Sequence, residues 1–316
     1  MTHLKSTLMR RRQLLTLTAV LTLSMSMTTF ALAQNAPVRV GSKIDTEGKL
    51  LGNMIVLALE AGGVKTENKT ALGNTKIVRG ALIAGEIDIY PEYTGNGAFM
   101  FAEESNPAWK NARAGYERVK TLDMEKNKLV WLEPSPANNT WSIAIRKDVA
   151  TANKLKTLDD MGKWINSGGQ FKLAASAEFV ERSDAMPAFQ AAYGFKLKPE
   201  QVLTLAGGDT AVTIRAAAEK TSGVNAAMAY GTDGPVAALG LVIMEDTKGV
   251  QPIYAPAPTV RADVLAKNPK IQTILAPVFK ALDGVTLQAL NAKIQIEGQD
   301  AKKVAGDFLK SKGLLK

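Results

Sequence analysis

The chain has 316 residues, of which 46% are hydrophobic and 22% charged, and its formal net charge is +9 at pH 7. This ordinary globular composition excludes a disordered or collagen-like chain, and the length allows about two domains. There is no cysteine, and the single histidine is His3. Beyond residue 33 the sequence therefore excludes cysteine nucleophiles, a Ser-His-Asp triad and Cys/His zinc sites.

Residues 1–33 have the three-part pattern of a secretory signal. A basic start is followed by an apolar stretch, Leu14–Leu23, and by the small-residue cleavage pattern Ala31-Leu32-Ala33. We expect cleavage after Ala33 and a periplasmic product. A membrane anchor is the alternative, but the apolar run is shorter than the ~20 residues that span a bilayer. The pair Arg11-Arg12 leaves export by the twin-arginine route open beside the general route.

The charge of the exported part is modest. Removal of the four bases of residues 1–33 takes the formal net charge from +9 to +5. The remaining lysines and arginines are scattered among acids without a basic stripe, so nucleic acid is not an expected partner. A Walker loop, a Gly-x-Gly-x-x-Gly fingerprint and a metal-ligand cluster are all absent from the sequence. We therefore expect no cofactor, no metal and no catalytic residue.

The first half of the exported part alternates strands and helices. In chain order, the pattern predicts a strand at 38–40, a helix after a cap at Asp45 or Thr46, a helix at 75–84 ended by Gly85, and a strand at 86–90. Strand, helix and strand in quick succession predict a parallel α/β layer.

The pattern restarts after Pro134-Ser135-Pro136. Strands are predicted at 141–145 and 171–174, followed by a helix that Asp184 caps and that ends near Tyr193. An amphipathic helix is predicted near 301–309.

Two segments resemble each other. Gly73-Asn74-Thr75 leads through a helix to Tyr93, and Gly208-Asp209-Thr210 leads through a helix to Tyr230, with Gly-to-Tyr spacings of 20 and 22 residues. The similarity predicts two similar lobes, each with a tyrosine-bearing loop. Because Gly-x-Thr before a helix is common capping chemistry, a chance match is the alternative.

Aromatic residues occur where predicted strands meet loops. Tyr93 follows the predicted strand at 86–90, and Trp141 starts the one at 141–145. Tyr230 opens a Gly-Thr-Asp-Gly turn, and Phe179 begins a helix after Ala177-Glu178. In open α/β sheets, ligands bind outside the carboxyl ends of strands. Rings there can enclose a quaternary ammonium, which is a cation without hydrogen-bond donors, through cation–π attraction. The alternative for each ring, and for Phe179 above all, is ordinary core packing.

Two basic residues are candidates for holding a carboxylate. Lys43 lies in the first strand-to-helix turn, and Arg182 follows a short predicted helix start. The alternative is that Arg182 pairs with the neighbouring acids Glu178, Glu181 or Asp184. We expect Asp233 and Glu92 to bond backbone groups.

Several motifs together resemble the periplasmic glycine betaine/choline-binding family of ABC importers. They are Gly41-Ser42-Lys43-x-x-Thr46-Glu47, Asp88–Gly95 with its Tyr-Pro-Glu-Tyr-Thr-Gly end, Asn138–Trp141 and Tyr230-Gly231-Thr232-Asp233-Gly234. The resemblance extends over essentially the whole exported part of the chain.

The resemblance implies a two-lobed α/β periplasmic binding protein of type II, with a hinge and a ligand cleft between the lobes. Lobe I would comprise residues 34–138 and 236–316, and lobe II residues 139–235. It also implies an aromatic cage for trimethylammonium and basic and polar groups for the carboxylate. The predicted ligand-binding residues are Lys43, Tyr93, Asn96, Trp141, Phe179, Arg182, Tyr230 and Thr232.

The chain departs from the family pattern at two of these positions. Trp141 stands where many relatives have Tyr, and Asn96 where they have Thr. A fourth cage ring is not evident between Tyr193 and Tyr230, and an incomplete cage would lose part of the cation–π attraction.

The predicted function is that of a monomeric, non-enzymatic solute-binding protein. It would deliver glycine betaine, an osmoprotectant, to a membrane ABC permease. The first alternative is another small zwitterion or cation, such as choline, carnitine or an amino acid. The second is an exported hydrolase or transferase that works through lysine and carboxylates.

Overall fold

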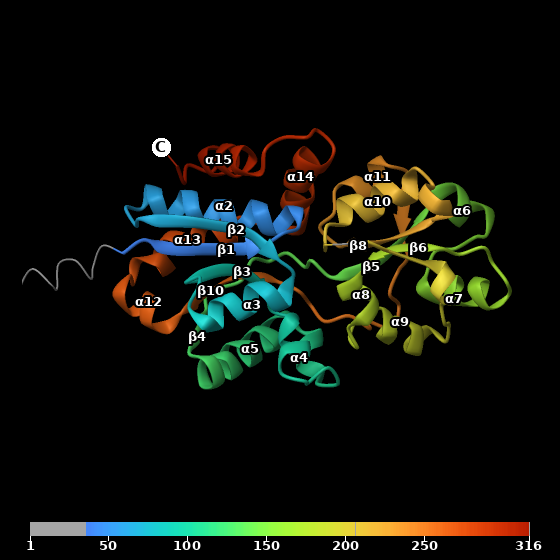
Figure 1. Ribbon diagram of the computed structural model, residues 1–316, viewed down its shortest axis with the longest axis horizontal. Helices are drawn as coiled ribbons and strands as arrows, with labels where there is room; N and C mark the ends of the chain where they lie inside the picture. Colours follow the sequence, from blue (N-terminus) through green and yellow to red (C-terminus); the bar gives the residue numbers. More distant parts are fainter. Residues whose placement is uncertain (1–35, 206, 316) are drawn as a thin grey trace, which may run out of the picture. The chain divides into compact units, whose positions relative to one another are not determined.

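Two mixed β-sheets of five strands each organise the chain (Figure 1). The computed structural model describes residues 36–205 and 207–315, so the predicted signal segment 1–33 and its cleavage site lie outside the described residues. All elements named below belong to one compact unit that starts at Val38.

Both sheets have the same strand pattern. The first has the order β2 (Thr66–Gly73), β1 (Val38–Lys43), β3 (Ile89–Tyr93), β10 (Pro256–Arg261) and β4 (Leu129–Trp131). The second has the order β7 (Val202–Leu205), β6 (Leu173–Ser176), β8 (Ala226–Tyr230), β5 (Trp141–Arg146) and β9 (Leu241–Ile243). In each, three neighbouring strands are parallel, and the two remaining pairings are antiparallel. The predicted similarity of the two segments thus corresponds to a repeated strand–helix–strand arrangement.

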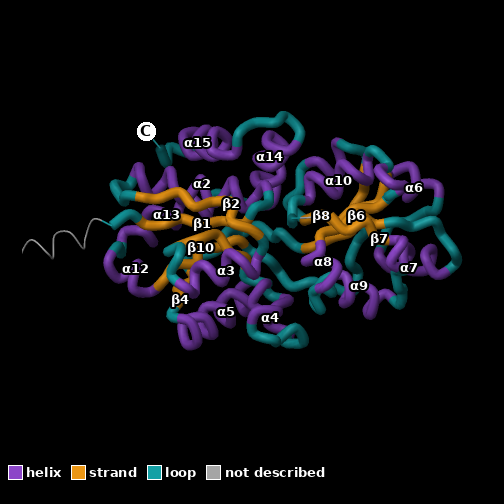
Figure 2. Tube along the Cα trace, in the orientation of Figure 1, coloured by secondary structure: helices purple, strands orange, loops and turns teal. Residues whose placement is uncertain are grey.

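Helices alternate with these strands along the chain (Figure 2). The helices between or after strands of the first sheet are α2 (Thr46–Ala61), α3 (Thr75–Ala84), α4 (Asn96–Met100), α5 (Ala112–Asn127), α12 (Ala262–Lys267), α13 (Lys270–Lys280), α14 (Gly284–Gln295) and α15 (Ala301–Ser311), with the 3₁₀ turn η1 (Pro107–Lys110). Those among the strands of the second are α6 (Lys147–Ala152), α7 (Leu158–Asn166), α8 (Ala177–Glu181), α9 (Met186–Tyr193), α10 (Thr210–Ala218) and α11 (Pro235–Ala238), with the 3₁₀ turns η2 (Pro199–Gln201) and η3 (Thr221–Gly223).

Helix α2 anchors the first sheet. Its N-cap is Asp45, whose carboxylate accepts a hydrogen bond from the Gly48 N–H, and its side chains Leu50, Met54 and Leu59 are fully buried. Helix α3 lies on the other side of the sheet from α2 (Figure 1) and ends at Gly85, whose φ of 73° is the left-handed value that glycine adopts without strain. The predicted cap and stop are confirmed.

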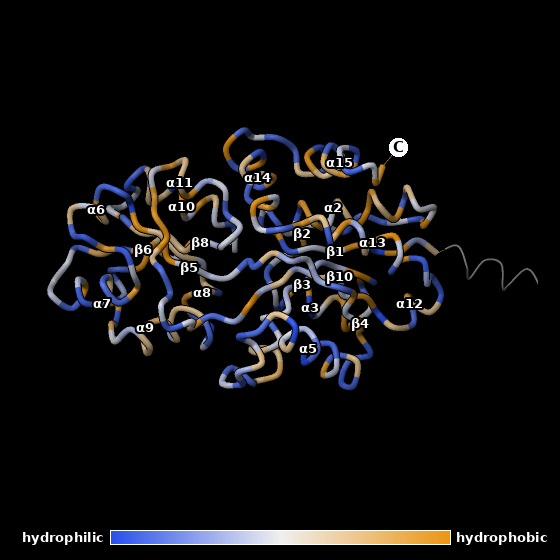
Figure 3. The backbone as a smooth tube through the Cα atoms, turned by 180° about the vertical axis from the view of Figure 1, so that it is seen from behind, coloured by the Kyte–Doolittle hydropathy of each residue, from blue (hydrophilic) through white to orange (hydrophobic). Residues whose placement is uncertain are grey.

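The helices change repeatedly between hydrophobic and hydrophilic colour along their length in Figure 3, as expected where one face packs on a sheet. Within the described part of the chain, no single helix is both long and apolar enough to cross a membrane. Helices α13 and α14, bent by 87° at their break, pass that test as a pair by length and composition.

Several predicted boundaries differ from the structure. Strand β3 starts at Ile89 instead of residue 86, and β6 at Leu173 instead of residue 171, because pairing with distant strands decides where each begins. The polar edge strand β2 had no hydrophobic alternation by which to predict it. Asp184 is not a helix cap: α9 has Ala185 at its N-cap, and the Asp184 carboxylate binds Arg182 instead.

The chain leaves the first sheet after β4 and joins the second at β5. It leaves the second sheet after β9 and rejoins the first at β10. That the chain re-enters lobe I at residue 236 stays a prediction from the sequence. Strand β9 pairs with β5, and Glu245 forms a β-bridge with Thr157. We propose on this basis that the return to the first lobe comes after Glu245.

A buried ion pair joins three elements of the first sheet region. The guanidinium of Arg79, on α3, donates to both carboxylate oxygens of Asp123, on α5, at 2.7 and 2.5 Å. The same carboxylate accepts from the indole of Trp131, on β4, at 2.6 Å, and from the amide of Asn127 at 2.8 Å. Asp123 is fully buried.

Asp123→Ala should lower the free energy of unfolding by about 3–5 kcal/mol, because it leaves the Arg79 cation buried without its partner. Urea denaturation followed by circular dichroism measures this loss. Asp307→Ala, which breaks the exposed Lys303–Asp307 pair, is the matched control and should have little effect. Equal, small losses in both variants would contradict the proposed importance of the buried pair.

Candidate functional site

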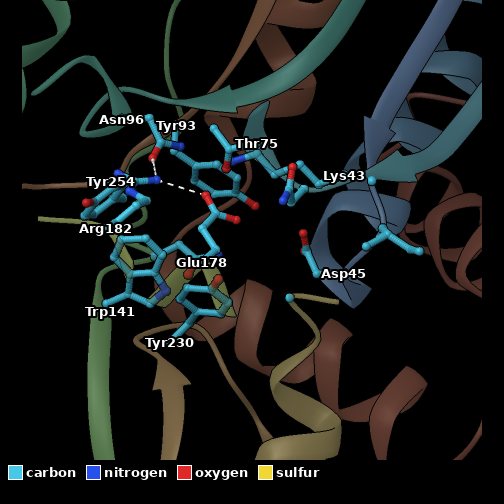
Figure 4. Close-up of a pocket in the computed structure, with 15 residues that line it drawn as sticks. Lys43, Asp45, Thr75, Tyr93, Asn96, Trp141, Glu178, Arg182, Tyr230 and Tyr254 are labelled. Atoms are coloured by element: carbon cyan, nitrogen blue, oxygen red, sulfur yellow. Dashed lines mark hydrogen bonds and ion pairs between the residues drawn. The ribbon is translucent and has the colours of Figure 1, made fainter. Parts of the chain in front are cut away.

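One pocket gathers side chains from the strand ends of both sheets (Figure 4). It is a cavity of about 40 Å³, enough for a few water molecules. Its lining consists of Lys43, Ile44, Asp45, Gly73, Asn74, Thr75, Tyr93, Asn96, Asn139, Trp141, Glu178, Arg182, Gly208, Tyr230 and Tyr254. Both tyrosine-bearing segments identified as similar in the sequence contribute to it. The position agrees with the expectation that ligands of open α/β sheets bind at the carboxyl ends of strands.

Four aromatic rings line this pocket: Tyr93, Trp141, Tyr230 and Tyr254. Trp141 lies directly opposite Tyr230 in the β5–β8 pairing, and their rings stack with centroids 6.2 Å apart. Tyr254 meets Trp141 edge-on at 5.8 Å. Adjacent antiparallel strands thus place two rings side by side, and the segment before β10 adds a third.

Tyr254 is the ring that sequence reasoning missed. Tyr254 lies outside the stretch between Tyr193 and Tyr230 that the sequence pattern indicated for a fourth ring, because it comes just before β10. Its signal was present in the run Tyr254-Ala255-Pro256-Ala257-Pro258, since an aromatic residue at the start of a strand follows the same rule as the other rings.

Six of the eight predicted site residues line the pocket, and Phe179 and Thr232 do not. Phe179 is fully buried and packs edge-on against Trp141, with ring centroids 5.6 Å apart. Thr232 is also buried, and its backbone carbonyl accepts a hydrogen bond from the Asn291 amide at 3.1 Å. Phe179 therefore contacts the pocket residue Trp141 without lining the pocket itself.

Lys43 reaches the pocket already paired with a carboxylate. Its Nζ lies 2.7 Å from Oε1 of Glu92 and 4.7 Å from the centroid of the Tyr93 ring. Glu92 is fully buried and also accepts from the Tyr90 hydroxyl, the Tyr93 N–H and the Asn96 amide. Burial raises the pKa of Glu92, but Lys43 and the hydrogen bonds outweigh that effect and leave the pKa below its ordinary value.

Arg182 is paired as well, and with the neighbours that formed the alternative interpretation of the sequence. Asp184 accepts from Nε at 2.9 Å and from Nη2 at 2.7 Å, and Glu178 accepts from Nη1 at 3.1 Å. The Asn96 carbonyl oxygen accepts a further bond from Nη1 at 2.9 Å. The guanidinium also lies over the Trp141 ring, 4.5 Å from its centroid.

The buried carboxylate of Glu47 contacts residues that line the pocket. Glu47 accepts hydrogen bonds from the Tyr93 hydroxyl and from the amides of Asn139 and Asn291. These contacts hold the Tyr93 ring and join α2 to the segment before β5 and to α14. Sequence reasoning did not assign Glu47 a role, because its partners are 46 to 244 residues away in the chain.

Burial also raises the pKa values of two aspartates near the pocket. The pKa of Asp45 rises to about 6, although Lys43 and the Gly48 N–H oppose the shift. The pKa of Asp233 rises to about 7, although hydrogen bonds from the Tyr230 N–H and the Thr210 hydroxyl oppose the shift.

Among the described residues, no group of three or more acids or histidines has the geometry of a metal site.

Comparisons with known proteins give matches over most of the chain. Residues 36–311 match the family model described as the substrate-binding domain of an ABC-type glycine betaine transport system. The chain is 66% identical to the glycine betaine-binding protein YehZ of Escherichia coli K12 over 89% of this chain and 92% of that protein. It is 32% identical to a glycine betaine-binding protein of Pseudomonas aeruginosa over 90% of each.

A solved structure extends the comparison to three dimensions. The ligand-free YehZ of E. coli superposes with a TM-score of 0.65 over 88% of this chain and 99% of that chain, at 66% identity. The fold is that of a type II periplasmic binding protein, as the sequence predicted.

The raised pKa of Asp233 should make the free energy of unfolding depend on pH. Because its folded-state pKa of about 7 exceeds the unfolded value, the folded protein holds a proton that the unfolded chain loses. Its contribution to stability is fully present below about pH 4 and is lost as the pH rises through about 7.

The variant Asp233→Asn removes this titration. Asparagine can keep both contacts, since the Thr210 hydroxyl can accept as well as donate. The free energy of unfolding of the variant should therefore rise relative to the wild type between about pH 4 and 7 and then level off. Urea denaturation of both proteins at four or five pH values measures the difference. Parallel pH profiles would contradict the raised pKa.

Proposed function

The chain belongs to the family of substrate-binding domains of ABC-type glycine betaine transport systems, and from this premise we propose that it captures glycine betaine for a membrane ABC permease. The family consists of transport proteins, and we propose binding without chemistry for this chain. The arrangement of four aromatic rings around a single pocket carries the proposal.

The rings suit the cationic end of the ligand. A trimethylammonium group has no N–H to donate, so polar side chains cannot satisfy it, whereas ring faces attract it by roughly 0.5–2 kcal/mol each. Tyr93, Trp141, Tyr230 and Tyr254 would enclose this group.

The carboxylate end would interact with the basic side of the pocket. Lys43 and Arg182 both line it, and a guanidinium can bind a carboxylate through two N–H groups. Asn96, which bridges Glu92 and Arg182, supports the geometry of both cations. A ligand carboxylate would join ion pairs that the protein has already formed.

Closure would couple binding to transport. We propose two lobes built on the two sheets, with the ligand in contact with both, so that binding stabilises the closed arrangement that the permease recognises. Hydrogen bonds such as Asn96–Arg182 and Thr46–Asp209 already connect the elements of the two sheets. We propose that the protein acts as a monomer.

The second candidate ligand is choline or another quaternary cation. One observation favours it: Asp45 and Glu178 bring two carboxylates to the pocket, while Lys43 and Arg182 are already paired with acids. Calorimetric titration against glycine betaine, choline, carnitine and proline decides between these ligands. Saturable binding of glycine betaine, with the ligand recovered unchanged, supports the proposal. Turnover of any of these compounds would contradict it.

A binding protein of an ABC importer is an exported protein, and we propose the periplasm as its location. The signal pattern of residues 1–33 supports this placement.

Export predicts a specific N-terminus. The mature protein isolated from the periplasm should begin at Gln34, because the small-residue pattern at Ala31 and Ala33 is what signal peptidase recognises. Intact-mass spectrometry of the periplasmic fraction measures this directly. A protein that retains residues 1–33 would contradict the prediction.

The cage predicts how ring substitutions affect affinity. Tyr93→Ala or Tyr230→Ala should weaken glycine betaine binding by about 5–30-fold, which corresponds to ~1–2 kcal/mol of lost cation–π attraction. Tyr230→Phe should lose much less, because the ring face remains. Calorimetry measures the dissociation constants. Tyr193→Ala, outside the pocket lining, is the control, and unchanged affinity in both pocket alanine variants would exclude these rings from the site.

A further inference from the structure

The hydrogen-bonding capacity of Arg182 is almost exhausted within the protein. A guanidinium has five N–H groups. Asp184 accepts two of them, from Nε and Nη2, and Asn96 and Glu178 accept the two of Nη1. One N–H of Nη2 is left, so a ligand carboxylate that binds Arg182 through two N–H groups must replace one of these acceptors.

The three acceptors differ in how firmly they are held. Asp184 binds bidentately, has a side chain only 3% exposed, and lies 3.4 Å from the Tyr254 hydroxyl, which donates to it. Asn96 is buried and is fixed through its amide by Glu92 at 2.7 Å. Neither residue can move away without breaking a second contact.

Glu178 is held by one contact. Its bond to Nη1 is the longest of the four, at 3.1 Å, and it is the only hydrogen bond of this side chain in the part of the chain that the structure describes. The side chain is 17% exposed and lines the pocket beside Trp141 and Tyr230 (Figure 4). It is the acceptor that a ligand carboxylate can displace.

We propose that Glu178 is an internal competitor for the carboxylate of the substrate at Arg182, and that it sets the preference between zwitterionic and purely cationic quaternary ammonium ligands. This inference rests on the proposed function and adds to it a specificity-determining residue.

The charge of Glu178 acts in opposite directions on the two ligand classes. It repels the carboxylate of a zwitterion and occupies that group's place on Arg182. It attracts a trimethylammonium group held by the neighbouring rings. Because Glu92 already balances Lys43 and Asp184 already pairs with Arg182, the charge of Glu178 is not cancelled by a cation of its own.

The test is Glu178→Gln, which keeps the shape of the side chain and an oxygen that can accept from Arg182, but removes the charge. We expect the dissociation constant for glycine betaine to fall and that for choline to rise, so that their ratio changes by roughly tenfold or more. Calorimetric titrations of wild type and variant with both ligands, at one salt concentration, measure the ratio.

Glu181→Gln is the matched control. Glu181 lies on the same short helix α8, is exposed, and forms no hydrogen bond or ion pair within the described residues. The substitution removes the same charge at a position that does not line the pocket. The ratio of the two dissociation constants should therefore stay at its wild-type value. An equal change in both variants would mean that general electrostatics, not competition at Arg182, is responsible.

The remaining outcomes separate the inference from the proposed function. If Glu178→Gln leaves the ratio unchanged, or weakens both ligands equally, Glu178 only supports the fold and the inference is wrong. If neither protein binds glycine betaine but the variant binds choline more weakly than the wild type does, the proposed ligand is wrong, whereas the charge effect of Glu178 stands. If choline binding is also unchanged or absent, both are overturned.

Discussion

The buried carboxylate of Glu92 is the contact on which the rest of the site depends. It is fully enclosed, and it is stable as an anion because it accepts from Lys43, the Tyr90 hydroxyl, the Tyr93 N–H and the Asn96 amide at once. Without such partners, burial would favour the protonated, neutral form of this carboxyl group. One carboxylate thereby fixes a cation, a backbone turn and an amide that all face the pocket.

That arrangement extends to the second sheet through Asn96. Its amide nitrogen donates to Glu92 and its carbonyl oxygen accepts from Arg182, which Asp184 holds on the other side. The basic side of the pocket is therefore one connected network.

The two sheets explain why rings from distant segments meet. Each places a helix N-terminus and a tyrosine-bearing strand end on the same side, and antiparallel pairing of β5 with β8 sets Trp141 opposite Tyr230. Tyr254 joins them because β10 returns to the first sheet beside β3. The aromatic part of the pocket thus follows from strand order, while its polar part follows from buried charge.

The sequence by itself determined the local features of this protein. The Asp45 cap, the Gly85 stop, the helix at 75–84 and the start of a strand at Trp141 depend on a few neighbouring residues, and these predictions agree with the structure.

Only the tertiary structure decided which groups meet. Glu47 with Asn291, Arg182 with Asn96 and Tyr254 with Trp141 are brought together by strand order over long chain separations. Local periodicity and capping carry no information about such distances. For the same reason the sequence left two kinds of partner open for Arg182, a ligand or its neighbouring acids. The folded protein pairs Arg182 with Glu178 and Asp184, because burial excludes the water that would otherwise compete for these groups.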